Sequence, residues 1–217
     1  MPKNLRLTFV FNLLITVLVI AGMVIIFTRT GRGGILLSGG WLSLRYYTTL
    51  SNVFCGLTGL LTCIRILRSG RITRPLFAGK LMTAAATGLT FLVVLLFFGP
   101  LYGLRFMYMG SNFLFHLVVP LLALVDFFLL PFPDGQKIPF RFTLLAAVPT
   151  VVYGACYAVN LFVNGIGEWP YSNDWYGFVN WGYPVGFTIF GCFVLVTWLF
   201  SCLLRGVNHL VHKKRTS

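Results

Sequence analysis

The chain has 217 residues, of which 58% are hydrophobic and 10% are charged, and its mean hydropathy is +0.87. A soluble globule of this size needs far more polar surface, so the composition excludes one and indicates a multi-span membrane protein. The net charge of +13 does not indicate a nucleic-acid partner, because the basic residues lie between apolar segments and are not clustered on a soluble domain.

Six apolar segments follow one another along the chain, each long enough to cross a hydrocarbon core of about 30 Å as an α-helix. They cover about residues 7–27, 46–67, 81–98, 113–130, 142–163 and 183–204. The first exceeds the apolar region of a signal peptide and no small-residue cleavage site follows it, so we expect it to be retained. Without an internal repeat or a second domain, the sequence predicts an all-α fold, one six-helix membrane bundle over residues 1–217.

The connections near the N-terminus carry glycine, aromatic and basic residues. A glycine-rich stretch from Thr30 to Gly40 follows the first span. Trp41, Tyr46 and Tyr47 come next, where an interfacial aromatic belt is expected. A loop with an arginine at every third position precedes the third span and ends at Lys80. We interpret this basic loop as an orientation signal in preference to a site for anionic headgroups.

The later connections are marked by prolines and by candidate helix caps. Gly99 and Pro100 are expected to end the third span, and Ser111 and Asn112 are N-cap candidates for the fourth. A polar, aromatic loop from Asn164 to Trp181 joins the last two spans, and we expect it to be hydrated.

Charged residues near the other end of the bundle have structural interpretations. Asp126 is expected to pair with Lys137 or Arg141, because all three lie near one end of the bundle. His209 and His212, in the basic tail, are expected to be solvated.

The distribution of basic residues predicts the orientation of the bundle. Six spans place both termini on one side, together with thirteen of the 17 lysines and arginines. The other side has four, namely Arg29, Arg32, Arg45 and Arg105. By the positive-inside rule we expect an integral protein of the cell membrane with both termini cytoplasmic.

The second span carries small and polar residues on one helical face, within an otherwise apolar helix. They are Thr48, Asn52, Cys55, Gly59 and Thr62. In lipid such a stripe turns inward, because small residues let helices approach and polar groups need partners that hydrocarbon does not supply.

Polar residues of three spans are expected at one depth. Spans two and four both begin at the outer face, so Thr48 lies in the first turn of one and His116 about two turns into the other. Asn112 lies one turn above His116. Three residues of the fifth span end at the same level: Tyr153, Tyr157 and Asn160. We expect this set, with Asn52, to form a site in the outer leaflet.

Two motifs resemble the androgen-induced-gene family of small multi-span membrane proteins, including its bacterial relatives. They are residues 46–52, Tyr-Tyr-Thr-Thr-Leu-Ser-Asn, and residues 112–116, Asn-Phe-Leu-Phe-His, with Pro120. The resemblance implies a membrane-embedded threonine nucleophile and histidine base, at Thr48 and His116 here, acting on fatty acid esters of hydroxy fatty acids. This chain departs from the pattern in its second threonine, Thr49, and in its loop at residues 169–171.

The residues themselves are suited to acyl transfer. A threonine hydroxyl is a poor nucleophile until a base takes its proton, and His116 is the one imidazole expected within the spans. Helix N-termini near Thr48 and His116 would favour the oxyanion of a tetrahedral intermediate. Thr49 points about 100° away from Thr48 around the helix, so both hydroxyls do not face the histidine equally.

No third catalytic residue stands out. Asp126 lies about 15 Å along the helix from His116, too far to orient its ring. Asn52, Asn112, Asn160 or an acid of the outer loop would have to do so. The alternative to catalysis is that the threonines are helix-capping hydroxyls and that His116 is a satisfied structural residue.

Alternative functions use the same residues. One is a non-enzymatic protein that binds or transports lipids, and another is an acyltransferase that passes the acyl group to a lipid alcohol. No cofactor or metal is expected, because the five cysteines lie inside apolar segments and a lone buried histidine supplies no paired haem ligands. The sequence does not predict the acyl chain or the oligomeric state.

Overall fold

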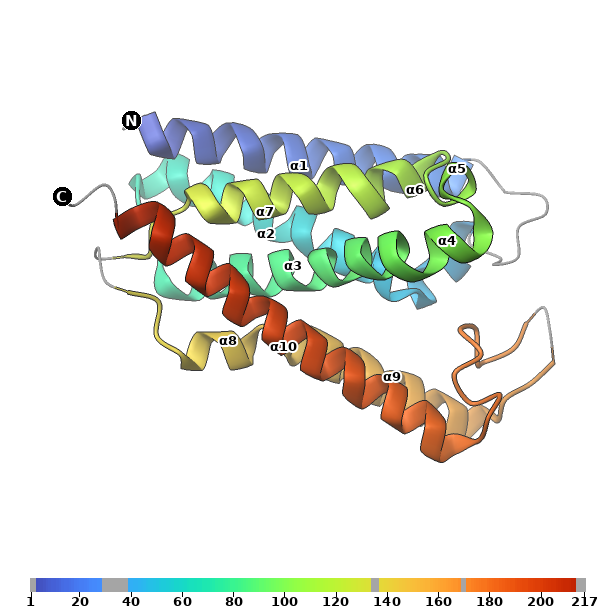
Figure 1. Ribbon diagram of the computed structural model, residues 1–217. Helices are drawn as coiled ribbons and strands as arrows, with labels where there is room; N and C mark the ends of the chain where they lie inside the picture. The colour runs from blue at the N-terminus through green and yellow to red at the C-terminus, as the bar shows by residue number, and fades with distance from the viewer. Residues whose placement is uncertain (1–2, 29–38, 134–136, 169–170, 214–217) are drawn as a thin grey trace.

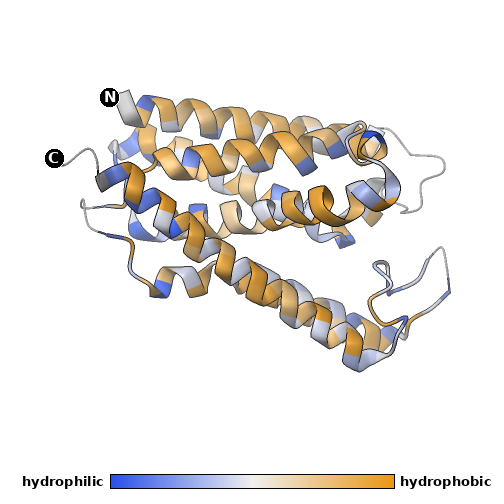
Figure 2. Ribbon diagram, viewed as in Figure 1, coloured by the Kyte–Doolittle hydropathy of each residue, from blue (hydrophilic) through white to orange (hydrophobic). Residues whose placement is uncertain are grey.

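The computed structural model describes residues 3–28, 39–133, 137–168 and 171–213 (Figure 1). Within these ranges the chain forms helices and no strand, and six segments are long and apolar enough to cross a membrane. They are Leu5–Thr28, Tyr47–Ser69, Arg74–Tyr102, Ser111–Leu129, Arg141–Asn164 and Tyr183–His212. Figure 2 shows hydrophobic residues along all of them. The predicted all-α, six-helix bundle is confirmed.

Three spans are continuous helices and three are interrupted. The continuous ones are α1 (Lys3–Thr28), α2 (Tyr47–Ser69) and α10 (Tyr183–Lys213). The third span consists of α3 (Arg74–Val93), a π-helical turn η2 (Val94–Phe98) and α4 (Gly99–Tyr102). The fourth consists of α6 (Ser111–Phe113), a second π-helical turn η3 (Leu114–Val118) and α7 (Val119–Leu129), and the fifth of α8 (Arg141–Leu145) and α9 (Val148–Asn164). A 3-10 helix, η1 (Gly40–Arg45), precedes α2, and α5 (Leu104–Met107) precedes α6.

The helices form a four-helix core and a diverging pair. The core consists of α1, α2, α3 and α7, packed side by side, and α10 crosses α3 and α7 at the end where α1 begins (Figure 1). This end, here called the closed end, is filled by an aromatic cluster that includes Phe77, Phe127 and Phe142. Toward the opposite or open end, α9 and α10 diverge from the core (Figure 1).

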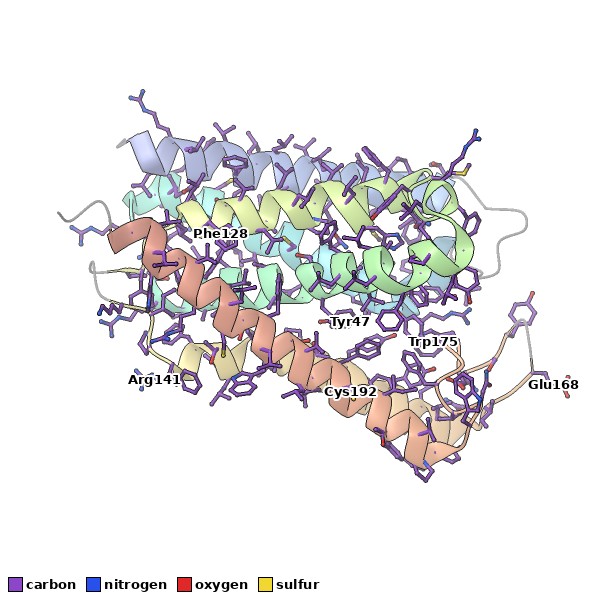
Figure 3. The ribbon with its side chains drawn as sticks, in the orientation of Figure 1. Tyr47, Phe128, Arg141, Glu168, Trp175 and Cys192 are labelled. Carbon is purple, nitrogen blue, oxygen red and sulfur yellow. The ribbon has the colours of Figure 1, made fainter. Side chains whose placement is uncertain are left out.

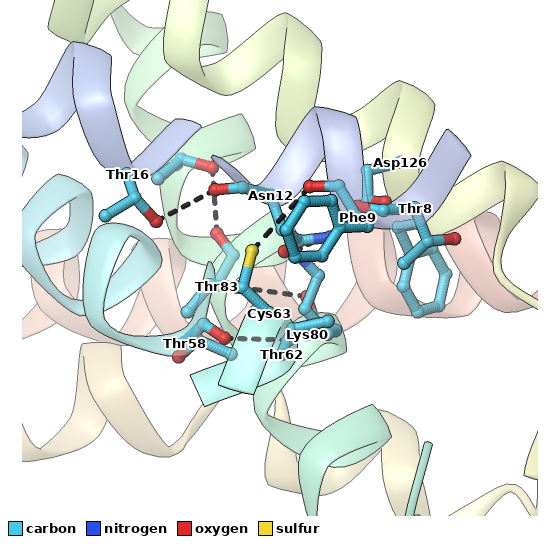
Figure 4. A network of polar contacts seen from close by, with 12 residues as sticks. Thr8, Phe9, Asn12, Thr16, Thr58, Thr62, Cys63, Lys80, Thr83 and Asp126 are labelled. Carbon is cyan, nitrogen blue, oxygen red and sulfur yellow. Dashed lines mark hydrogen bonds and ion pairs between the residues drawn. The ribbon is translucent and has the colours of Figure 1, made fainter. Parts of the chain in front are cut away.

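A buried ion pair links three core helices near the closed end. Lys80 Nζ of α3 lies 2.7 Å from Asp126 Oδ2 of α7 and donates to Asn12 Oδ1 of α1 at 2.6 Å (Figure 4). The Asn12 amide donates in turn to Asp126 Oδ2 and to the carbonyl of Thr8. All three side chains are buried, so each charge is compensated inside the bundle, as hydrocarbon surroundings require.

This ion pair corrects two predictions. The third span begins at Arg74 and not near residue 81, so Lys80 lies within the helix and does not close a basic loop. Asp126 consequently pairs with Lys80, and the expected partners Lys137 and Arg141 are wrong. Hydropathy misplaced the helix start because a lysine lowers the average of its window although its charge is neutralised by a residue far along the chain.

The predicted polar stripe of α2 does turn inward. Thr48 is half-buried, and the other four members, from Asn52 to Thr62, are buried. A β-carbon added at Gly59 would lie 3.0 Å from the Asn12 carbonyl oxygen, and one added at Gly56 would lie 2.9 Å from Val19. The small residues therefore permit the close approach of α1 and α2.

Two predicted helix boundaries are wrong. The third span does not end at Gly99 and Pro100, because the helix widens into the π-turn η2 and continues to Tyr102. The fourth span begins at Ser111, directly after Gly110, which has φ 59° and is the N-cap, so neither Ser111 nor Asn112 caps the helix. Glycine suits this cap because other residues rarely adopt a positive φ.

Aromatic and titratable residues also depart from expectation. Trp41 is 79% exposed, as a belt residue would be, but Tyr46 is buried and Tyr47 half-buried, both facing inward. His209 is partly exposed, and its Nε2 also accepts a hydrogen bond from the Ile138 N–H at 2.9 Å. The predictions for residues 30–38, for Arg29 and Arg32, and for residues 169–170 lie outside the described residues.

We predict that the Lys80–Asp126 pair is required as a pair and not for either charge alone. Lys80→Met leaves the Asp126 carboxylate buried without its cation, so it should lower the free energy of unfolding by about 3–5 kcal/mol. The double variant Lys80→Met/Asp126→Leu should recover most of that loss. Thermal and chemical unfolding in mixed micelles checks this, with the exposed Arg71→Met as the matched control. A double variant less stable than both single variants would contradict the pairing argument.

Candidate functional site

A cavity of about 460 Å³ lies at the open end, between the core and the diverging pair. It is lined by residues from the start of α2, the two π-turns, α9, α10 and the loop before α10. Six phenylalanines contribute to its wall: Phe98, Phe106, Phe115, Phe178, Phe190 and Phe193. Its polar lining includes Thr48, Thr49, Thr90, Asn112, His116 and Thr150. A mostly apolar cavity with a few polar groups is typical of a site for a small amphiphilic ligand.

The structure brings together four of the seven predicted site residues. Thr48, Asn112, His116 and Tyr153 all line the cavity. Asn52 lies directly behind it and contacts the backbone of two cavity-lining segments. The other two predicted residues, Tyr157 and Asn160, are not among the lining residues.

The orientation of His116 is fixed by a backbone carbonyl. Its Nδ1 lies 2.9 Å from the carbonyl oxygen of Met107, which precedes the fourth span. Because a carbonyl oxygen only accepts, Nδ1 must carry the proton, which leaves the lone pair on Nε2. No protein group in the described part of the chain bonds Nε2, and His116 lines the cavity. This is the tautomer that a general base requires.

The segment that supplies the carbonyl depends on two glycines. Gly103 has φ 88° and Gly110 has φ 59°, and between them the chain reverses direction through α5. Met107 itself is buried, so its carbonyl is held in place beside the histidine ring. The sequence indicated an asparagine or an acid as the group that orients the His116 ring. The group is instead a main-chain carbonyl, which every residue type carries and which the sequence therefore does not reveal.

The π-turn that carries His116 follows from Pro120. The N–H of Val119 bonds the carbonyl of Leu114, five residues back. The next donor in this pattern would be residue 120, but proline has no N–H. The carbonyl of Phe115 is thereby left without its helical partner. Single π-turns inside α-helices are frequent at functional sites.

Asn52 occupies that vacant position. Its Nδ2 donates to the Phe115 carbonyl at 3.0 Å and also to the Thr48 carbonyl, one turn back on α2, at 2.8 Å. One amide therefore bridges the turn that presents Thr48 and the turn that presents His116. Asn52 is fully buried, so its role is in positioning and not in contact with a ligand.

Two residues at the start of α2, Thr48 and Thr49, line the cavity. Leu50 makes the first helical hydrogen bond, to the Tyr46 carbonyl, and the Tyr47 N–H donates to the Tyr176 hydroxyl. The N–H groups of Thr48 and Thr49 have no such partner within the described residues. Two unpaired N–H groups at a helix N-terminus favour a developing negative charge.

The loop before α10 folds over one side of the cavity, and is not simply hydrated. Tyr176 lines the cavity, and burial raises the pKa of Tyr176 to about 12, so its hydroxyl stays protonated. Trp175 Nε1 donates to the Tyr153 hydroxyl, which donates to the Arg45 carbonyl. Figure 3 shows Trp175 and Tyr47 between the core and the diverging pair.

Asp174 anchors this loop. Its carboxylate accepts a hydrogen bond from the Tyr157 hydroxyl and two more from the N–H groups of Phe178 and Val179, each at 2.9 Å. Tyr157 is therefore a support for the loop and not a wall of the cavity. Asn160 lies beyond this contact and accepts from the amide of Asn164.

Comparison of the chain with family models, with curated proteins and with solved structures gives no match. Among the described residues, no three of His, Cys, Asp and Glu gather in a group that could hold a metal ion.

We predict that Asn52 holds the two site-forming turns together. Asn52→Leu keeps the volume but leaves the Phe115 carbonyl without its donor, while the Thr48 carbonyl keeps the Ser51 hydroxyl, so the variant should lower the free energy of unfolding by about 1–3 kcal/mol. Asn160→Leu, at a residue outside the cavity, serves as the control and should change stability by less than about 0.5 kcal/mol. Unfolding of both variants in the same detergent checks this, and equal effects would refute a specific bridging role for Asn52.

Proposed function

We propose that the protein is an intramembrane lipid ester hydrolase in which Thr48 is the nucleophile and His116 the general base. The observation that carries the proposal is that one cavity is lined by the Nδ1-protonated His116 and by Thr48 and Thr49, whose N–H groups have no partner among the described residues. Nucleophile, base and oxyanion donors are the groups that acyl transfer needs in one place.

In the proposed reaction His116 Nε2 takes the proton of the Thr48 hydroxyl as its oxygen attacks the ester carbonyl carbon. The resulting oxyanion accepts hydrogen bonds from the free N–H groups at the start of α2. The imidazolium then gives its proton to the leaving alkoxide, and an acyl-threonine remains. Water then attacks this ester as Nε2 takes its proton, and the imidazolium returns that proton to the leaving Thr48 oxygen, which releases the fatty acid and restores both residues.

No hydrogen bond joins the side chains of Thr48 and His116 in the described part of the chain. Catalytic hydrogen bonds are often longer without substrate and tighten when the substrate binds. Met107, through its carbonyl, fills the place of the carboxylate that orients the histidine in other hydrolases. A carbonyl stabilises an imidazolium less than a carboxylate does, so we expect a slow enzyme.

The substrate we propose is a long-chain fatty acyl ester, of which fatty acid esters of hydroxy fatty acids are the class implied by the family resemblance. Six phenylalanines in the cavity wall support a long acyl chain, because each buried methylene contributes about 0.8 kcal/mol to binding. The membrane bilayer is the source of such a substrate.

The catalytic assignment predicts a specific pattern of losses. Thr48→Ala and His116→Ala should each lower kcat/KM on a long-chain chromogenic ester by at least about 1,000-fold, and the double variant should be no worse than either, because the two groups act as a unit. Thr49→Ala, which removes the neighbouring hydroxyl that also lines the cavity, is the matched control and should keep most activity. Loss on Thr49→Ala with retention on Thr48→Ala would reassign the nucleophile.

Retention of activity in all three variants would favour the non-enzymatic lipid-binding alternative for this cavity. An acyltransferase would show the same losses, but its product would be a new ester and not the free fatty acid. Product analysis with and without an added lipid alcohol separates these two reactions.

We further propose that both termini are cytoplasmic, which places the cavity toward the outer leaflet. The basis is the excess of lysine and arginine on the side of the termini, which is the closed end. In a cysteine-free background, Tyr171→Cys should react with a membrane-impermeant reagent in intact cells, and Arg71→Cys should not. Both positions are exposed, and the reverse pattern would invert the bundle.

A further inference from the structure

Arg45 lies beside the cavity with its guanidinium between two aromatic rings. Its Cζ is 5.1 Å from the centre of the Tyr46 ring and 5.6 Å from the centre of the Trp175 ring. Its Nη2 donates to the Tyr46 hydroxyl at 3.0 Å. The carbonyl of Arg45 is also held, by the Tyr153 hydroxyl at 2.7 Å. The cation is therefore fixed in one place, at the last residue of η1.

No carboxylate among the described residues compensates this charge. Asp126 pairs with Lys80 near the closed end, and Asp174 is engaged by Tyr157 and two backbone N–H groups. Glu168 is exposed and forms no ion pair with Arg45. The described part of the chain thus contains a half-buried guanidinium without an anionic partner.

One donor of this guanidinium is also unsatisfied. Arg45 Nε is buried and has no hydrogen-bond partner in the described part of the chain. Buried donors are almost always paired in folded proteins, and an unpaired one calls for a ligand or another explanation. The planar fork of an arginine matches the paired oxygens of a carboxylate or a phosphate.

The position of Arg45 relates this charge to the cavity. Tyr46, under the guanidinium, and Tyr176, next to Trp175, both line the cavity, and their rings meet edge to face at 5.7 Å. Arg45 is not itself a lining residue, so an anion bound there would lie next to these two tyrosines of the cavity wall. An amphiphile fits this arrangement: an acidic group at Arg45 and an apolar chain in the cavity.

We propose that Arg45 is an anion-binding residue at the edge of the cavity, and that its ligand is a lipid with a carboxylate or a phosphate at the end of an apolar chain. Where this ligand is also a substrate, the proposal rests on the hydrolase function and adds that the ester carries an acidic group. Binding of the anion requires neither Thr48 nor His116. It is therefore tested in a protein without turnover.

The test uses Thr48→Ala as the background and three ligands with one chain length: hexadecanoate, hexadecyl phosphate and hexadecanol. Equilibrium binding in a neutral detergent should favour at least one anion over hexadecanol by at least about tenfold, the range of a charged hydrogen bond. Whichever anion binds more tightly identifies the carboxylate or the phosphate as the group recognised.

The variants separate Arg45 from the general positive charge of the protein. Arg45→Gln should abolish the preference and leave hexadecanol binding unchanged, and Arg45→Lys should retain part of it. Arg105→Gln, which removes an exposed cation at the same end, should keep the full preference. Thermal unfolding and unchanged hexadecanol binding establish that each variant is folded.

A protein that binds all three ligands equally, or an Arg45→Gln variant with an undiminished preference, would overturn the proposal. Neither outcome bears on the hydrolase function, because the measurement involves no ester. Conversely, an anion preference that depends on Arg45 would stand even if Thr48 proved not to be a nucleophile.

Discussion

The geometry of the candidate site depends on one side-chain amide. Asn52 has two N–H donors, and it gives one to the carbonyl of Thr48 and the other to the carbonyl of Phe115. The second of these carbonyls is free because Pro120 has no N–H to offer it. In hydrocarbon no water could replace the amide, so the Asn52 side chain is needed to hold the turn at Thr48 against the turn at His116. The relative placement of Thr48 and His116 follows from this bridge.

The two ends of the bundle differ: the closed end is tightly packed, and the open end contains the cavity. At the closed end the Lys80–Asp126–Asn12 network and an aromatic cluster join the core helices, so little freedom remains there. At the open end α9 and α10 diverge, and the space between them and the core is lined by phenylalanines and hydroxyls. We infer that packing at the closed end stabilises the bundle. The open end can then keep a cavity and unpaired N–H groups at the start of α2.

The sequence predicted those features that depend on local pattern and depth. Helical spacing placed the small and polar residues of α2 inward, and counting turns from the span starts placed Thr48, Asn112 and His116 at one level. It did not predict pairings between distant residues. Lys80 was assigned to a loop because its partner, Asp126, lies on another helix, and the Met107 carbonyl that orients His116 has no residue signature. Pro100 and Pro120 were the available signals for the two π-turns, but Pro100 was interpreted as the end of its span and Pro120 only as part of the family motif.

The central claim is that Thr48 becomes acylated with His116 as its base. The most direct measurement treats the purified protein with a lipophilic phosphonate probe for hydrolases and maps the modified residue by peptide mass spectrometry. The account predicts one adduct per chain, on Thr48, that is absent from Thr48→Ala and strongly reduced in His116→Ala. An adduct confined to another residue, or a folded protein that stays unmodified by several such probes, would contradict it.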